Sequence, residues 1–137
     1  MKTMLVKISL VTASLTSAAM LLLAQPAGAI TGDGTNFIYC NNRYTIAARY
    51  WGKARMFVYG CSNNYVWVTV ASTTNWAKGA GIVRNSPYAS RYTATTGYSY
   101  YSTITPMLVY VTGTCYTATG WSMDSNYGAD QAYKWCH

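Results

Sequence analysis

The sequence predicts an all-β fold, a small antiparallel sandwich or barrel held together by disulfides. Short segments rich in Val, Tyr, Thr and Trp, each about 5 to 7 residues long, are separated by residues that favour turns. No heptad repeat and no convincing amphipathic helix interrupts this pattern. The four cysteines of so small a chain indicate a disulfide framework, which is common in exported domains with a modest core.

The first 29 residues have the form of a secretory signal peptide. Lys2 and Lys7 accompany an apolar segment over 8–23, and residues 27–29 end it with the A-x-A pattern that precedes a cleavage site. A transmembrane anchor is the alternative, but hydroxyl residues interrupt the apolar run and a cleavage-type ending follows. We therefore expect residues 30–137 to form a single secreted domain that does not insert into a membrane after cleavage.

The first half of this domain contains four candidate strands, over residues 37–40, 44–51, 55–59 and 65–70. The helix-forming pair Ala47 and Ala48 leaves a short helix as the alternative for the second of them. The Tyr, Thr, Ile and Trp residues around that pair favour a strand.

The segment over residues 65–70 alternates most regularly. Tyr65, Trp67 and Thr69 lie on one face of the predicted strand, and three valines lie on the other. The valine face is expected in the core. Together with residues 55–59 this strand is predicted to form a β-hairpin.

The second half of the domain is harder to divide into elements. It is interpreted as a loop-rich stretch over 72–90 with one β-like patch at Ile82-Val83, one or two exposed strands within 91–101, a strand over 107–112, a strand over 115–119, a loop over 120–128 and a short strand or turn over 129–137. The run from Pro106 to Cys115 is expected to be a buried strand fixed at its end, because proline is tolerated at the start of a strand and a cysteine closes the run.

The four cysteines Cys40, Cys61, Cys115 and Cys136 allow three disulfide connectivities. The spacing does not decide among them, although both neighbouring pairs are 21 positions apart. Local pairing, Cys40 with Cys61 and Cys115 with Cys136, is favoured. Each such bond would contribute on the order of 3 kcal/mol by closing its loop. A zinc site built from all four thiolates is disfavoured because no C-x-x-C pair is present.

The composition argues against an enzyme. The chain has one histidine, which is its last residue, and its three acidic residues are far apart in the sequence. General acid–base catalysis needs titrating groups placed together, and no G-x-S-x-G, phosphate-binding or metal-binding motif is present. We expect no catalytic residues, no cofactor and no metal.

The charge is mildly basic. The whole chain has a net charge of +7, and removal of Lys2 and Lys7 with the signal leaves +5. The basic residues are spread singly, which is typical of a solvated surface rather than of a nucleic-acid site, so no nucleic-acid partner is expected.

Aromatic residues are the most abundant candidates for binding. The domain contains 14 tyrosines and five tryptophans, which suit surfaces that are partly apolar and partly hydrogen-bonding. Tyr88 and Tyr101 belong to a tyrosine-rich group around 88–101, which two arginines flank. The predicted ligand-contact residues are Tyr65, Trp67, Tyr92, Tyr98, Tyr100, Trp121, Arg84 and Arg91.

The run from Pro106 to Cys115 and the following Thr119-Gly120-Trp121 resemble the spore-associated protein A family of filamentous actinobacteria. Residues 40–46, residues 65–70 and a cysteine near the C-terminus support the resemblance. It implies a small, secreted, non-catalytic β protein at the spore surface.

A second resemblance, to bacterial SH3-like cell-wall modules, covers the C-terminal half. It rests on the segment from Val83 to Pro87 and on the pattern from Cys115 through Tyr127-Gly128 to Tyr133-Lys134. This likeness implies binding to the cell wall.

The leading hypothesis is therefore a secreted, non-enzymatic component of the spore or cell surface, with a cell-wall or spore-surface polysaccharide as its partner. One alternative is a glycan-binding or wall-binding module that uses its aromatic faces. Another is a secreted hydrolase inhibitor that presents the loop over residues 85–90.

Overall fold

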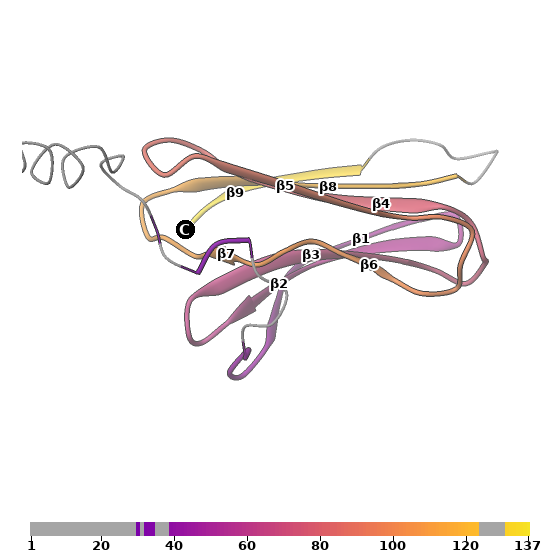
Figure 1. Ribbon diagram of the computed structural model, residues 1–137, viewed down its shortest axis with the longest axis horizontal. Helices are drawn as coiled ribbons and strands as arrows, with labels where there is room; N and C mark the ends of the chain where they lie inside the picture. Colours follow the sequence, from indigo (N-terminus) through magenta and orange to yellow (C-terminus); the bar gives the residue numbers. More distant parts are fainter. Residues whose placement is uncertain (1–29, 31, 35–38, 124–130) are drawn as a thin grey trace, which may run out of the picture.

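The computed structural model describes residue 30, residues 32–34, 39–123 and 131–137. These residues form two antiparallel β-sheets that pack face to face (Figure 1), which confirms the predicted all-β sandwich. In this described part, no helix is long and apolar enough to cross a membrane.

The first sheet has the strand order β1-β2-β3-β6, and β7 also pairs with β3. Its strands are β1 (Tyr44–Trp51), β2 (Ala54–Cys61), β3 (Tyr65–Ser72), β6 (Thr103–Ile104) and β7 (Leu108–Val109). The predicted hairpin is confirmed as β2–β3, and residues 44–51 form a strand rather than a helix.

The second sheet has the strand order β5-β4-β8-β9. Its strands are β4 (Lys78–Arg84), β5 (Ser90–Thr96), β8 (Cys115–Ser122) and β9 (Gln131–Cys136). The tyrosine- and threonine-rich strand β5 is thus an edge strand, and β4 lies between β5 and β8.

The core lies between the sheets. Val66, Val68 and Val70 of β3 are all fully buried there, as the alternation of this segment predicts. Gly120 of β8 faces them so closely that a Cβ at this position would lie 2.8 Å from Cγ2 of Val70. The inner faces of the two sheets are therefore in direct contact at this point.

The interpretation of residues 72–90 as mainly loop is wrong, because β4 is a full strand in the middle of the second sheet. Gly79 and Gly81 are the reason for the error, since isolated glycines are usually depleted in strands. Here the side chains of Trp121 and Thr119 on β8 cover these two glycines, where a Cβ would collide with them. Cross-strand side chains thus replace the packing that the glycines lack.

The buried strand predicted for the run from Pro106 to Cys115 is also wrong in its extent, because the run contains only the short strand Leu108–Val109 before Cys115 begins β8. The amide of Tyr110 still donates to the carbonyl of Asn64 beside β3, but the amide of Val111 donates to the hydroxyl of Tyr116 on β8 in the second sheet. Where the segment crosses between the sheets, the Tyr116 side chain therefore supplies a hydrogen-bond acceptor in place of a strand carbonyl.

Two smaller corrections concern the ends of elements. Tyr39 and Cys40 lie outside any strand, and residues 37 and 38 of that predicted strand lie outside the described residues. Strand β8 continues to Ser122, so the loop expected from residue 120 begins later, and residues 124–130 are not described.

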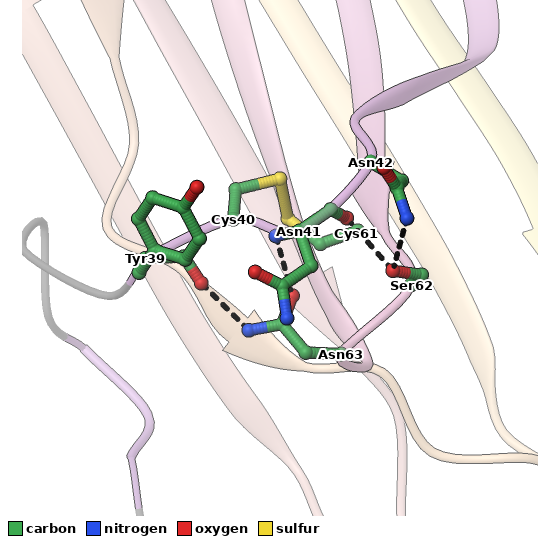
Figure 2. The surroundings of a disulfide bond; sticks show 7 residues. All are labelled: Tyr39, Cys40, Asn41, Asn42, Cys61, Ser62 and Asn63. Atoms are coloured by element: carbon green, nitrogen blue, oxygen red, sulfur yellow. Dashed lines mark hydrogen bonds between the residues drawn. A yellow bond between two sulfur atoms is a disulfide. The ribbon is translucent and has the colours of Figure 1, made fainter.

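The disulfides join Cys40 to Cys61 and Cys115 to Cys136, which confirms the favoured local pairing. Figure 2 shows that hydrogen bonds reinforce the first bond: the amide of Asn41 donates to the side chain of Asn63 (3.0 Å), and the hydroxyl of Ser62 donates to the carbonyl of Asn41 (3.0 Å). The second bond links β8 to β9 at a paired position of the ladder. Each disulfide therefore fixes one end of a different sheet.

Candidate functional site

The loop over residues 97–102, between β5 and β6, carries three strongly exposed tyrosines and is named here the tyrosine loop. Tyr98, Tyr100 and Tyr101 are 70%, 72% and 82% exposed. None of their rings packs on another aromatic ring within the described part of the chain. Their flat faces are thus accessible to a ligand.

A buried lysine holds the backbone of the tyrosine loop in place. Lys78 is the first residue of β4, and its side chain is fully buried on the inner side of the sheet. Its ammonium group donates hydrogen bonds to the carbonyl of Ser99 and to the carbonyl of Tyr101, the latter at 3.0 Å. With these two carbonyls directed inward, the loop backbone is fixed while its tyrosine side chains point outward.

Burial lowers the pKa of Lys78, because the charged ammonium is removed from water. A buried charge without a counter-ion is costly unless hydrogen bonds satisfy it. Lys78 was not among the predicted site residues. Its position at the start of a seemingly glycine-rich loop gave no signal that it would be buried.

Arg84, predicted to contact a ligand, is instead buried at the other end of β4 with 2% exposure. Its guanidinium group forms an ion pair with Asp33 and donates to the carbonyls of Tyr88 and Val109. The amide of Val109 also donates to the Asp33 carboxylate, at 2.6 Å. Arg84 therefore holds together three segments and is not available at the surface.

The predicted Tyr65 and Trp67 face lies on the outer side of the first sheet. Trp67 is only 6% exposed and packs against Tyr59, whose ring stacks on Phe57 at 5.6 Å between ring centroids. The Arg43 guanidinium lies 4.5 Å above the Tyr59 ring. The ring faces in this row are occupied by one another, so this surface is a weaker stacking platform than the tyrosine loop.

The remaining predicted residues lie on the second sheet. Arg91 is exposed on β5, and Trp121 is half-buried over Gly79, both on the outer face. Tyr92 points to the opposite side and packs against the core. The structure therefore brings Tyr98 and Tyr100 together in one loop, places Arg91 and Trp121 on the outer face of the second sheet, and packs the side chain of Tyr92 against the core.

Among the described residues, no group of three or more His, Cys, Asp or Glu side chains is arranged to hold a metal ion. Comparisons with protein-family models, with curated proteins and with solved structures find no match to this chain.

Proposed function

We propose that this chain is a secreted, non-enzymatic protein of the spore or cell surface that binds a wall or spore-surface polysaccharide through the tyrosine loop. The observation that carries the proposal is that Tyr98, Tyr100 and Tyr101 are all at least 70% exposed on a loop whose backbone a buried ammonium fixes. The resemblance to the spore-associated protein A family supports the location.

Tyrosine rings suit this role because each combines an apolar face with a hydroxyl group. Sugars offer complementary apolar C–H faces and hydroxyl groups. Since Lys78 already holds the carbonyls of Ser99 and Tyr101, little backbone freedom would be lost when a ligand binds. The loop is therefore preorganised for contact.

Secretion is supported by two independent features of the chain. The first 29 residues have the pattern of a cleavable signal, and both disulfides are of the kind that persists in oxidising compartments. A polysaccharide of the cell wall or spore coat would be accessible to a protein exported in this way.

The test is a sedimentation assay of the purified, oxidised protein with spores, peptidoglycan, chitin and cellulose, at low and high salt. We expect retention on at least one polymer to survive high salt, since stacking contacts are less screened than exposed charges. The triple variant Tyr98→Ala, Tyr100→Ala, Tyr101→Ala should lower that retention about tenfold.

The control is the double variant Tyr39→Ala, Tyr50→Ala, which removes two tyrosines that are 81% and 69% exposed outside the loop. It should keep the wild-type retention. Equal losses in both variants, retention that high salt abolishes, or no retention on any polymer would each reject the proposal. The last result would direct attention to inhibition of hydrolases by the loop over residues 85–90.

A further inference from the structure

The outer face of the second sheet contains a groove of about 420 Å³, a volume within the usual range of small-molecule sites. We name it the threonine groove. It is lined by Gly81, Ile82, Val83 and Asn85 from β4 and its end, Arg91, Tyr92 and Thr93 from β5, Thr117 and Thr119 from β8, and Lys134 from β9. It extends across all four strands of the sheet.

The walls of the groove come from a short sequence that occurs twice. Tyr-Thr-Ala-Thr stands at residues 92–95 in β5 and at residues 116–119 in β8, and both strands pair with β4. Gly81 of β4 pairs with Thr93 on one side and with Thr119 on the other. Because Gly81 has no side chain, the hydroxyl of Thr119 lies over it, and the exposed Thr93 stands on its other side.

Two exposed cations lie at the same level of the groove. Arg91, Val83, Thr117 and Lys134 are paired in one row across the sheet, with the cations on the two edge strands. Three strand spacings separate their backbones, about 14 Å, a gap that two long side chains can close over a ligand. A second depression of about 340 Å³ shares Val83 and Arg91 with the groove and extends it toward the loop after β4.

No side-chain carboxylate among the described residues competes for these cations. Asp33 is the one acidic side chain that the structure describes, and it is paired with Arg84 inside the molecule. Arg91 and Lys134 therefore present positive charge to solvent at a concave, hydroxyl-lined surface. Such a combination favours a ligand that has both hydroxyl groups and negative charge.

We propose that the threonine groove binds an anionic glycan, with its sugar hydroxyls on Thr93 and Thr119 and its carboxylate or phosphate group between Arg91 and Lys134. This deepens the proposed polysaccharide function and rests on it. The groove and the tyrosine loop lie along the same strand, because Lys78, which holds the loop, is five residues from Val83 on β4. That separation along β4 is about 17 Å, with Lys78 on the inner side of the sheet and the groove on its outer face.

The experiment measures the affinity of the oxidised protein for four soluble probes by calorimetry. Oligogalacturonate tests carboxylate, phosphorylated dextran tests phosphate, unmodified dextran is the neutral reference, and a single-stranded oligonucleotide tests a different polyanion. We expect at least one of the two charged glycans to bind about tenfold more tightly than unmodified dextran. Which of the two binds identifies the anionic group.

Two variants locate the binding. Arg91→Gln with Lys134→Gln should weaken binding of the charged glycan about tenfold and reduce its dependence on salt. Thr93→Val with Thr119→Val removes only the hydroxyls and should also weaken it. The matched control is Arg43→Gln with Arg55→Gln, which removes two exposed charges, one just before β1 and one on β2, and should change affinity less than about twofold.

The proposal is overturned if neither charged glycan binds better than unmodified dextran, if the oligonucleotide binds more tightly than both, or if the control variant loses as much affinity as the groove variants. It is overturned as well if either groove variant leaves the affinity unchanged. In that case, retention on an insoluble polymer that depends on the three loop tyrosines would still support the function proposed for the tyrosine loop. Conversely, groove binding without tyrosine dependence would reject only the function proposed for the loop.

Discussion

Asp33 holds a glycine-rich turn segment in place through one buried ion pair. It lies between Gly32 and Gly34, yet its carboxylate pairs with Arg84, and the two side chains are only 12% and 3% exposed. Removing one member of a buried pair leaves the other charge without compensation, which costs far more than losing a surface ion pair.

We predict that Asp33→Asn lowers the free energy of unfolding by about 3 kcal/mol. Urea unfolding near neutral pH measures the change. Arg91→Gln, which removes an exposed arginine, is the control and should change stability by less than about 0.5 kcal/mol. A loss below about 1 kcal/mol in Asp33→Asn would mean that the carbonyls of Tyr88 and Val109 satisfy Arg84 without the carboxylate.

Lys78 gives the protein a characteristic pH dependence. Burial lowers its pKa from the ordinary value of 10.5, so the folded protein releases this proton at a lower pH than the unfolded chain does. Between the lowered pKa and 10.5 the unfolded chain binds more protons, and the contribution of Lys78 to stability therefore rises with pH.

The variant Lys78→Met keeps most of the packing and cannot titrate. The quantity to compare is the unfolding free energy of the wild type minus that of Lys78→Met. We expect this difference to be larger at about pH 9.5 than at about pH 7. Titration of the tyrosines affects both proteins and cancels in this difference. A difference that stays constant or shrinks with rising pH would contradict the assigned burial of the ammonium.

At the level of elements, the sequence predicts strands well where the alternation is regular and poorly where packing comes from a neighbour. The β2–β3 hairpin followed from its alternating valines alone. Strand β4 could not be predicted, because its glycines are covered by Trp121 and Thr119, which lie about 40 residues further along the chain.

The candidate site was predictable only in part for the same reason. Tyr98 and Tyr100 are exposed as predicted, although they lie in a loop after β5 rather than on a strand. The buried state of Lys78 and of Arg84 depends on partners that only the fold supplies. Charged residues are almost never fully buried unless they are paired, so a sequence pattern assigns both to the surface.

The two disulfides join different elements over equal distances in the chain. Each separates its cysteines by 21 residues, so the chain-entropy model gives both the same effect on the unfolded state. We predict that Cys40→Ala with Cys61→Ala, and Cys115→Ala with Cys136→Ala, each lower the free energy of unfolding by about 3 kcal/mol.

Chemical unfolding of the two double variants beside the oxidised wild type checks this prediction. A loss below about 1 kcal/mol for the first pair would show that the hydrogen bonds of Asn41 and Asn63 hold the segment without the disulfide (Figure 2). A much larger loss for the second pair would show that edge strand β9 depends on its covalent link to β8.

At the scale of the whole molecule, composition and cysteine spacing were sufficient to predict an all-β, disulfide-linked domain. Abundant β-branched and aromatic residues with frequent turn residues are compatible with few other architectures. The pairing order of the sheets was not predictable, since β4 pairs with β8 although the three strands β5, β6 and β7 lie between them in the chain. Such long-range pairing leaves no local pattern in the sequence.

Both disulfides lie at the same end of the sandwich. In the first sheet, Cys61 pairs with Tyr65, which in turn pairs with Val109. The carbonyl of Val109 accepts a hydrogen bond from Arg84 of the second sheet. Arg84 pairs with Tyr116, the neighbour of Cys115. The opposite end, with Lys78 and the tyrosine loop, is held by hydrogen bonds and packing in the described residues. We therefore expect local opening of the sandwich to begin at the end that has no disulfide. A ligand seated on the tyrosine loop would then protect the end of the sandwich that a protease reaches first.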